Sequence, residues 1–426
     1  MQPRGAMRNT PGTPLAAGGL ALGWAGKESR ARPEPRLLVE DEAAGEPCGD
    51  AWNNRLILGD NLLVLKALER EFANSVRCAL IDPPYNTGSV FAQYDDGVEH
   101  SLWLSFMRDR LEHLRPLLAP DGTLWITVDD HEAHYCKVLC DEVFGRRNFV
   151  ANVVWQKRTS PDARLALGAA QDHILVYARD IARLRLNPIP LSAEQARSYR
   201  NPDNDPRGPW ASTDFTAQGW RPNQMYGIAS PSGAVFSPPE GRCWANVEPV
   251  FQALREDNRI WFGKQGAARP RVKSFLREAA GIRAWTWWPH TETGHNQEAK
   301  KESIALFGGS AAFSTPKPER LVRRVLDIAT DPGDLVLDCF AGSGTTGAVA
   351  HKMGRRWIMA ENGSHALTHI VPRLRKVVRG EDSGGITQSV GWQGGGGFRT
   401  FRLGASLVEL PQQRVLSALL APASAA

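Results

Sequence analysis

The chain has 426 residues, of which 42% are hydrophobic and 23% charged, so it can bury a large core and hold one big α/β domain with a smaller inserted or appended one. Its formal net charge of +5 is mild and does not by itself indicate a polyanionic partner. No apolar run approaches the roughly 18 to 20 residues that a membrane span needs, which argues against a membrane protein.

The six cysteines form no CxxC pair and are typical of reduced thiols in a cytosolic protein. A metal site is one interpretation of four neighbouring side chains, His131, His134, Cys136 and Cys140. No second cluster completes a tetrahedral ligand set, and the helical spacing of the apolar residues favours an ordinary amphipathic helix there.

Residues 1–50 are rich in Gly, Ala, Pro and Arg without periodicity. Such a segment cannot bury enough apolar surface to offset the entropy of ordering, so we expect a disordered leader. Order should begin with a strand at residues 55–58 and a helix at residues 62–72, for which Asp60 is a suitable N-cap. The apolar run 78–81 is stopped by two prolines and predicts a buried strand that ends at a rigid turn.

Strands and helices continue to alternate after this turn. The expected elements are a helix at 101–118, a turn at 121–122, a strand at 123–128, a helix at 131–144, and strands at 149–155 and 174–177. This alternation predicts a doubly wound sheet.

Residues from about 185 to 290 lose that rhythm, although a helical piece is expected near residues 272–280. The stretch from 151 to 320 holds 23 Lys and Arg against 16 Asp and Glu, and eight of the 14 tryptophans. It contains a basic run followed by three tryptophans: Lys264, Arg269, Arg271, Lys273 and Arg277, then Trp285, Trp287 and Trp288. Cations suit phosphates, and aromatic rings suit bases, so this pattern fits a groove-reading surface. An irregular domain with a tryptophan core and a solvated basic face explains the composition equally well.

Regular order returns near the C-terminal end. The expected elements are a helix at 318–329, a strand at 335–340, a Gly-rich loop at 341–346 that opens a helix through 351, and a strand at 357–360 closed by Glu361. A strand, a small-residue loop and a helix, with an acid at the end of the next strand about 20 residues on, indicate an adenosine-ligand site. The loop lacks the Lys of a phosphate loop and the GxGxxG spacing, so S-adenosylmethionine fits better than a phosphate-rich cofactor. A plain Gly-rich connection is the alternative.

Two motifs carry a resemblance to a known family. The first is Asp82-Pro83-Pro84-Tyr85, followed by Asn86-Thr87-Gly88, and the second runs from Asp338 to Thr346 (DCFAGSGTT). In this order, with a long variable stretch between them, they closely resemble the beta class of amino-group DNA methyltransferases. Residues 58–61, 258–263, 294–299 and 315–318 add a resemblance to the modification subunits of type III restriction-modification systems and their solitary relatives. The likeness spans about residues 53–403.

The resemblance implies the S-adenosylmethionine-dependent methyltransferase fold, a doubly wound, mostly parallel sheet of the seven-stranded type with an inserted target-recognition region. The expected domains are the leader (1–50), a discontinuous catalytic domain (51–184 and 300–380), the target-recognition region (185–299) and a partly irregular C-terminal extension (381–426).

The resemblance also implies roles for individual residues. Asp82 and the Pro83 carbonyl would accept hydrogen bonds from the target amino group, and Tyr85, next to Pro84, would stack on a base flipped out of the duplex. The residues expected to hold S-adenosylmethionine are Asp60, Lys317, Asp338, Phe340, Gly342, Ser343, Gly344, Thr345, Thr346 and Glu361. Those expected to bind DNA are Lys264, Arg269, Arg271 and Lys273. No metal is expected, because a sulfonium is already a strong methyl donor and catalysis is mostly alignment.

The activity implied is site-specific methylation of adenine N6 in double-stranded DNA. Methylation of cytosine N4 is the alternative within the same chemistry, but that branch more often has Ser before Pro-Pro-Tyr, so Asp82 favours adenine. An inactive DNA-binding specificity module is the alternative from another class. Besides DNA, the resemblance allows for a homodimer and for a restriction (helicase-nuclease) subunit as partners, in the cytoplasm at the bacterial nucleoid, and for no membrane.

Overall fold

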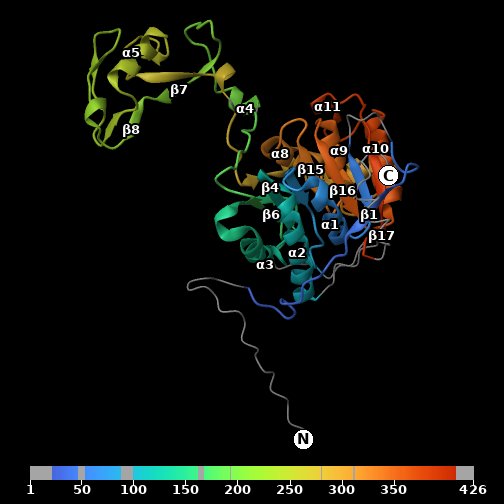
Figure 1. Ribbon diagram of the computed structural model, residues 1–426. Coiled ribbons are helices and arrows are strands. Elements are labelled where there is room, and N and C mark those ends of the chain that lie inside the picture. Colours follow the sequence, from blue (N-terminus) through green and yellow to red (C-terminus); the bar gives the residue numbers. More distant parts are fainter. Residues whose placement is uncertain are drawn as a thin grey trace, which may run out of the picture. The chain divides into compact units, whose positions relative to one another are not determined.

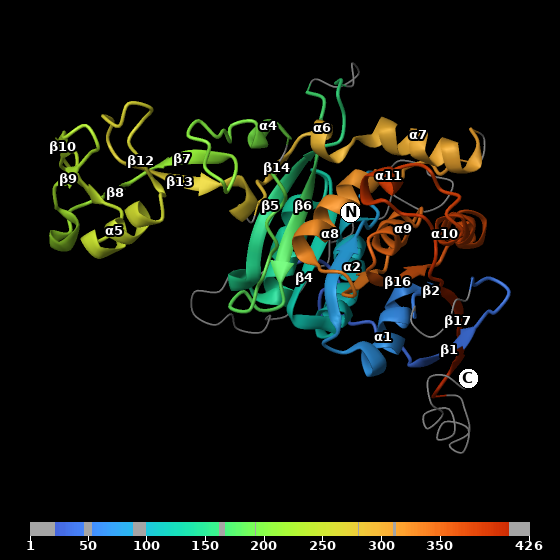
Figure 2. The same cartoon turned by 90° about the horizontal axis from the view of Figure 1, so that it is seen from above.

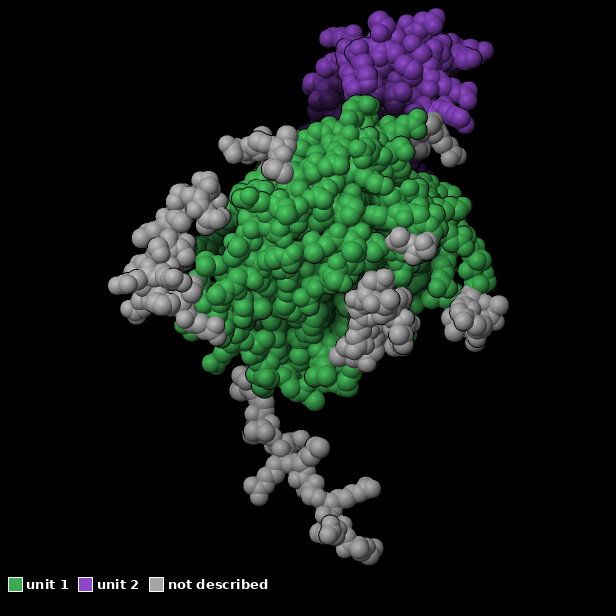
Figure 3. Space-filling view, turned by 90° about the vertical axis from the view of Figure 1, so that its right-hand side faces the viewer, with its two compact units in different colours: residues 1–187, 285–426 green, residues 188–284 purple. Residues whose placement is uncertain are grey.

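The computed structural model describes residues 22–46, 53–87, 99–161, 167–191, 193–279, 281–309 and 312–408. It divides into two compact units, one of Met1–Asn187 with Trp285–Ala426 and one of Pro188–Ala284 (Figures 1 and 3). The smaller unit therefore ends earlier than the region expected at 185–299, and residues 285–299 belong to the larger unit.

In its described residues, the larger unit is built on a ten-stranded sheet in the order β1-β17-β2-β16-β15-β3-β4-β6-β5-β14. The strands are β1 (Arg36–Glu40), β2 (Arg55–Leu58), β3 (Val76–Ile81), β4 (Leu118–Val128), β5 (Phe149–Gln156), β6 (Gln171–Ala178), β14 (Trp287–Trp288), β15 (Leu335–Asp338), β16 (Arg356–Glu361) and β17 (Arg399–Ser406). Strand β6 is antiparallel to β4 and β5, β1 is antiparallel to β17, and the other pairs are parallel. The predicted fold class, a doubly wound and mostly parallel sheet, is confirmed, and the sheet is wider than seven strands.

Helices pack on both faces of this sheet (Figures 1 and 2). The helices of the unit are α1 (Asn61–Phe72), α2 (His100–Leu114), α3 (Ala133–Cys140), α6 (His290–Thr293), α7 (Asn296–Phe307), α8 (Glu319–Ala329), α9 (Thr345–Lys352), α10 (Val371–Val378) and α11 (Thr387–Val390). Side chains alternate between the faces of a strand. In β16, Ile358 and Ala360 join the core that buries α1, α2 and α3, whereas Met359 packs against Gly347 of α9.

The order of the strands creates a ligand-binding position. From β3 the chain crosses through α2 to β4, whereas from β15 it crosses through α9 to β16, in the opposite direction along the sheet. Strands β3 and β15 are parallel neighbours, with Val336 opposite Cys78. Their carboxyl ends therefore form the topological switch point at which open α/β sheets bind ligands.

The chain near the two ends of the described region differs from the expected leader and extension. The leader prediction is wrong for residues 22–46, because β1 forms the edge of the main sheet there. The expected extension, 381–426, includes β17, which lies between β1 and β2. Each strand pairs with a segment far away in the sequence, so the local pattern gave no sign of either.

The structure contradicts the local prediction made for β4 and confirms the one made for α3. The turn expected at Asp121 and Gly122 is wrong, because both residues lie inside β4, where its register with β3 shifts. Gly122 is required there, since a Cβ atom would lie 2.6 Å from the Val76 carbonyl oxygen. The amphipathic helix is confirmed as α3, which buries Cys136 and Cys140. Among the described residues, there is no cluster of metal-ligating side chains and no helix long and apolar enough to cross a membrane.

The smaller unit is built from short strands and two helices. They are α4 (Ala193–Ala196), β7 (Trp210–Asp214), β8 (Thr216–Gln218), β9 (Ile228–Ala229), β10 (Val235–Phe236), β11 (Arg242–Trp244), α5 (Glu248–Glu256), β12 (Ile260–Trp261) and β13 (Arg271–Phe275). An aromatic core around Phe215, Trp244 and Phe251 holds them together. The helical piece predicted near 272–280 is wrong for residues 272–275, which belong to β13, the central strand of a three-stranded sheet, whereas Leu276–Glu278 form one turn of 3-10 helix.

Candidate active site

The two motifs meet in one cavity of the larger unit, at the switch point between β3 and β15. Its volume is about 420 Å³, which is within the range of small-molecule sites. The predicted site residues that line it are Asp82, Pro83, Pro84, Tyr85, Lys317, Asp338, Phe340, Gly342, Ser343, Thr345, Thr346 and Glu361. Asp60 and Gly344, both predicted to hold the cofactor, are not among the lining residues.

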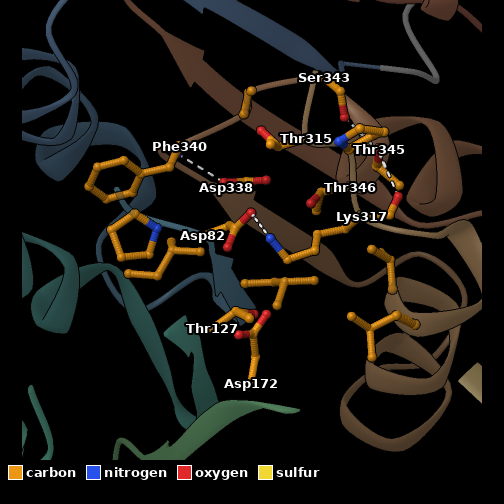
Figure 4. A pocket seen from close by; sticks show the side chains of 18 of the residues that line it. Asp82, Thr127, Asp172, Thr315, Lys317, Asp338, Phe340, Ser343, Thr345 and Thr346 are labelled. Carbon is orange, nitrogen blue, oxygen red and sulfur yellow. Dashed lines mark hydrogen bonds and ion pairs between the residues drawn. The ribbon is translucent and has the colours of Figure 1, made fainter. Parts of the chain in front are cut away.

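Asp82 follows the last residue of β3 and is held by two donors. The Tyr85 hydroxyl donates a hydrogen bond to Asp82 Oδ1 at 2.9 Å, and the Lys317 ammonium pairs with Asp82 Oδ2. The Trp103 indole N–H donates to the Pro84 carbonyl at 2.8 Å, which fixes the turn between Asp82 and Tyr85. Lys317 was predicted to hold the cofactor, but its ammonium contacts the carboxylate of the first motif (Figure 4).

A second carboxylate, Asp172, lies on the other side of Tyr85. Its Oδ2 is 3.3 Å from the Tyr85 hydroxyl, and its Oδ1 pairs with the Lys157 ammonium. Burial raises the pKa of Asp172 and, more strongly, that of Tyr85, so the phenol keeps its proton. Sequence reasoning missed Asp172 and Lys157. Their only signal was that charged residues stand at the ends of the apolar strands β6 and β5.

The loop after β15 is fixed by carboxylates at the ends of two strands. Asp338 accepts a hydrogen bond from the Phe340 amide at 2.9 Å, and Glu361 accepts one from the Gly342 amide at 2.8 Å. Gly342 and Gly344 have φ angles of 51° and 74°, a region that glycine adopts without strain. A Cβ atom on Gly344 would lie 2.8 Å from the Ile370 side chain, so Gly344 serves close packing behind the loop.

The two carboxylates of this loop have different electrostatic environments. Complete burial raises the pKa of Asp338 to about 7, although hydrogen bonds from Thr346 and the Phe340 amide act in the opposite direction. Burial also acts to raise the pKa of Glu361, but His365 and the Gly363 amide outweigh it and the net pKa is lowered. Glu361 is therefore an ionised acceptor, whereas Asp338 keeps its proton to a much higher pH than an ordinary carboxyl group.

Asp60 has a structural role in the described contacts. Its Oδ1 accepts from the Leu62 and Leu63 amides at 2.9 and 3.3 Å, as expected of the N-cap of α1. The next residue, Asn61, is the one that contacts the loop: its Nδ2 donates to the Cys339 carbonyl at 2.7 Å.

Arg373 of α10 holds the loop from behind and was not predicted. Its guanidinium donates to Thr345 Oγ1 at 2.8 Å and to the Ser343 carbonyl at 3.3 Å. It also pairs at 2.8 Å with Glu319, which in turn pairs with Lys352. All five residues are buried, so this network preorganises the loop.

The donor set fits a nucleoside cofactor without a phosphate chain. The loop from Asp338 to Thr346 contributes backbone amides and hydroxyls but no cation. Glu361 provides an ionised carboxylate at the end of the next strand, where ribose hydroxyls bind in nucleotide sites of this topology. Phe313 and Phe340 also line the cavity, and their apolar rings are of a kind that suits an adenine ring.

The predicted DNA-binding residues of the smaller unit separate into two groups. Lys264, Arg269 and Arg271 are exposed, and Arg271 donates to the Ser212 carbonyl at 2.9 Å. Lys273 is only 1% exposed and is paired with Asp203 and Asp205. Its prediction as a DNA-binding residue is wrong, because its ammonium neutralises two carboxylates inside the unit.

Comparison with known proteins adds an independent observation. A family model described as DNA methylase matches residues 76–371. The Type III restriction-modification enzyme StyLTI Mod subunit of Salmonella typhimurium is 35% identical over 328 residues, which cover 69% of this chain and 49% of that protein. The probable type III restriction-modification enzyme HindVI Mod subunit of Haemophilus influenzae is 30% identical, covering 87% of this chain and 56% of that protein. The chain thus spans about half the length of these relatives. The solved structure of PvuII DNA methyltransferase (cytosine-N4-specific) covers 78% of this chain and 90% of its own, with 14% identity and a TM-score of 0.44.

Proposed function

The chain belongs to the DNA methylase family whose model matches residues 76–371, and from this premise we propose that it is a site-specific DNA methyltransferase that uses S-adenosylmethionine to methylate adenine N6 in duplex DNA. The observation that carries the proposal is the single cavity lined both by Asp82 to Tyr85 and by the loop from Asp338 to Thr346. An amino-group acceptor and an adenosine site in one cavity are what direct methyl transfer requires.

The places of the residues in the cavity support the following proposed roles. Glu361 and the backbone of the loop would hold the cofactor, whose sulfonium supplies an electrophilic methyl group. The Asp82 carboxylate and the Pro83 carbonyl would accept the hydrogens of the target amino group and aim its nitrogen lone pair. Tyr85 would stack on the base, which has to leave the duplex to reach the cavity. The Lys317 ammonium neutralises Asp82 and orients its carboxylate.

The smaller unit, residues 188–284, is proposed as the target-recognition region. Lys264 and Arg269 supply exposed cations for phosphates, and Trp220, which is 70% exposed, supplies an aromatic face. The likeness to Mod subunits of type III restriction-modification enzymes supports a restriction subunit as a partner, and a second copy of the chain is proposed as a further partner. Light scattering of the purified protein, alone and with a candidate restriction subunit, tests both assemblies.

Expression in a bacterial host without DNA methylation tests the activity directly. Single-molecule sequencing of the host DNA should detect N6-methyladenine at one recurring sequence motif, and none in cells that express Asp82→Ala. Detection of N4-methylcytosine instead would show that the target atom is cytosine N4 and not adenine N6. Unmodified DNA, with folded protein present at normal amounts, would overturn the proposed activity.

A further inference from the structure

The hydroxyl of Tyr85 lies between two carboxylates. It is 2.9 Å from Asp82 Oδ1 and 3.3 Å from Asp172 Oδ2. A phenol has one hydrogen and donates it to one acceptor at a time. Rotation about the C–O bond therefore moves this hydrogen bond from Asp82 to Asp172 without breaking any covalent bond.

Asp172 is built into the wall of the cavity as a buried, neutralised acceptor. It is the second residue of β6 and 2% exposed, and it lies opposite Trp155 of β5. Lys157 follows β5 and pairs with Asp172 Oδ1, which leaves Oδ2 toward Tyr85. Because burial of an unpaired carboxylate is costly, the Lys157 ammonium makes this position tolerable. In Figure 4, Asp172 and Asp338 lie on opposite sides of the pair formed by Asp82 and Lys317.

The Tyr85 hydroxyl and the target amino group would compete for the same carboxylate oxygen of Asp82. In the structure, Asp82 Oδ1 accepts from Tyr85 and Oδ2 pairs with Lys317, so both oxygens already have donors. An incoming amino group needs an acceptor with a lone pair aimed at its hydrogens. A hydroxyl that stays on Asp82 Oδ1 would compete with that group for the same oxygen.

Resting on the proposed function, we infer that Asp172, neutralised by Lys157, is a positioning residue for methyl transfer. It takes over the Tyr85 hydrogen bond when the target amino group occupies Asp82, and in doing so it fixes the plane of the ring on which the base stacks. Asp172 acts through Tyr85, so its contribution requires the Tyr85 hydroxyl.

The chain contains a matched triad outside the cavity. The Tyr177 hydroxyl donates to Asp141 Oδ1 at 2.7 Å, and Lys137 pairs with Asp141 Oδ2 at 2.6 Å. Tyr177 also lies on β6, and none of the three residues lines the cavity. The same substitutions there report the general cost of disrupting a Tyr–Asp–Lys contact.

A double-mutant cycle on the full chain tests the inference. The rate constant for single-turnover transfer from tritiated S-adenosylmethionine to unmethylated bacterial chromosomal fragments is measured for the wild type, Asp172→Asn, Tyr85→Phe and the double variant, with protein and cofactor saturating. Asp172→Asn should slow transfer about tenfold when Tyr85 is present, as expected when one charge-assisted hydrogen bond is lost in the transition state, and less than about twofold together with Tyr85→Phe. Asp141→Asn should change the rate less than about twofold.

Each other outcome has a defined meaning. Additive effects of Asp172→Asn and Tyr85→Phe would show that Asp172 acts independently of the hydroxyl and would overturn the inference while the proposed function stands. An equal loss with Asp141→Asn would overturn it as well. Wild-type protein that transfers no methyl group would overturn the proposed function and the inference together. If Asp172→Asn does not fold, Lys157→Gln replaces it in the cycle, with the same expectation and the same contradicting result.

Discussion

The ammonium of Lys317 contacts the carboxylate of Asp82, although 235 positions separate the two residues in the chain. The contact joins the segment before α8 to the turn after β3. It places a cation at the proposed amino-group acceptor, where the sequence had indicated only a carboxylate and an aromatic ring.

Replacing Asp82 should abolish methyl transfer. Asp82→Ala removes the acceptor that aligns the target nitrogen, and we expect transfer to fall at least about a thousandfold, since alignment supplies most of the catalysis. The fold and cofactor binding should persist, because Asp82 lies beyond the last residue of β3. Tritium incorporation and calorimetric titration with the cofactor measure the two effects. Asp121→Asn, at a partly exposed ion pair with Arg77 that does not line the cavity, serves as the control, and retained transfer by Asp82→Ala would refute the assignment.

Lys317→Met should affect the rate more than cofactor affinity. The ammonium touches Asp82, whereas the Lys317 carbonyl, which accepts from Thr345 Oγ1 at 3.3 Å, is unchanged by the substitution. We expect the rate at saturating cofactor to fall roughly tenfold or more and the cofactor Kd to change less than about threefold. The opposite split, with a raised Kd and an unchanged rate, would restore the predicted role in cofactor binding.

Stability should depend on pH through Asp338. Its pKa is raised by burial from its ordinary value of 3.8 to about 7, so between these values the folded chain binds more protons than the unfolded one. The free energy of unfolding therefore falls as pH rises from about 4 to about 7. Asp338→Asn removes this penalty, and its advantage over the wild type should grow through that window to on the order of 1 kcal/mol or more and then level off.

Urea unfolding of both proteins over this pH range measures the difference. Glu302, whose pKa burial also raises to about 7, is present in both proteins, so its contribution cancels. A difference that does not vary with pH would contradict the environment assigned to Asp338.

Lys273 and its exposed neighbours should respond differently to substitution. Lys273→Met leaves Asp203 and Asp205 without their shared cation and should destabilise the smaller unit by roughly 3 kcal/mol. The double variant Lys264→Ala, Arg269→Ala should leave the free energy of unfolding within about 0.5 kcal/mol of the wild type. The slope of log K for DNA binding against log salt concentration should become shallower by the amount expected for the loss of about two phosphate contacts. Fluorescence anisotropy against salt concentration and thermal unfolding distinguish the two. An unchanged salt slope for the exposed pair would remove both residues from the DNA interface.

The strands that could be predicted from the sequence are those that a local pattern identifies without knowledge of the strands they pair with. Strands β3 and β15 and residues 123–128 of β4 are short apolar runs next to turn-forming residues, and their burial makes such runs recognisable. Strands β1 and β17 are partly exposed and pair mainly with each other and with β2. The pairing joins distant segments, so local composition indicated an irregular leader and an extension instead.

The same distinction applies to the site. The two motifs could be predicted to meet, because each follows a strand and the carboxyl ends of parallel strands share one edge of the sheet. Asp172 and Arg373 could not be predicted, since their roles depend on contacts with Tyr85 and Thr345 rather than on a local pattern. Lys273 was misassigned for a related reason, because the carboxylates that pair with its ammonium lie about 70 positions away in the sequence.

The position of β17 between β1 and β2 sets an order of events during synthesis. Both neighbours of β2, which are β16 and β17, emerge from the ribosome long after β2 itself, and among the described strands β1 pairs with β17 alone. Such non-local pairing slows folding, because the entropy cost of closing a long loop comes before the stabilising contacts between the strands can form. A nascent chain that stalls before residue 399 therefore exposes the unpaired edges of β1 and β2, which makes this stage the one at which a chaperone would matter and at which aggregation would start.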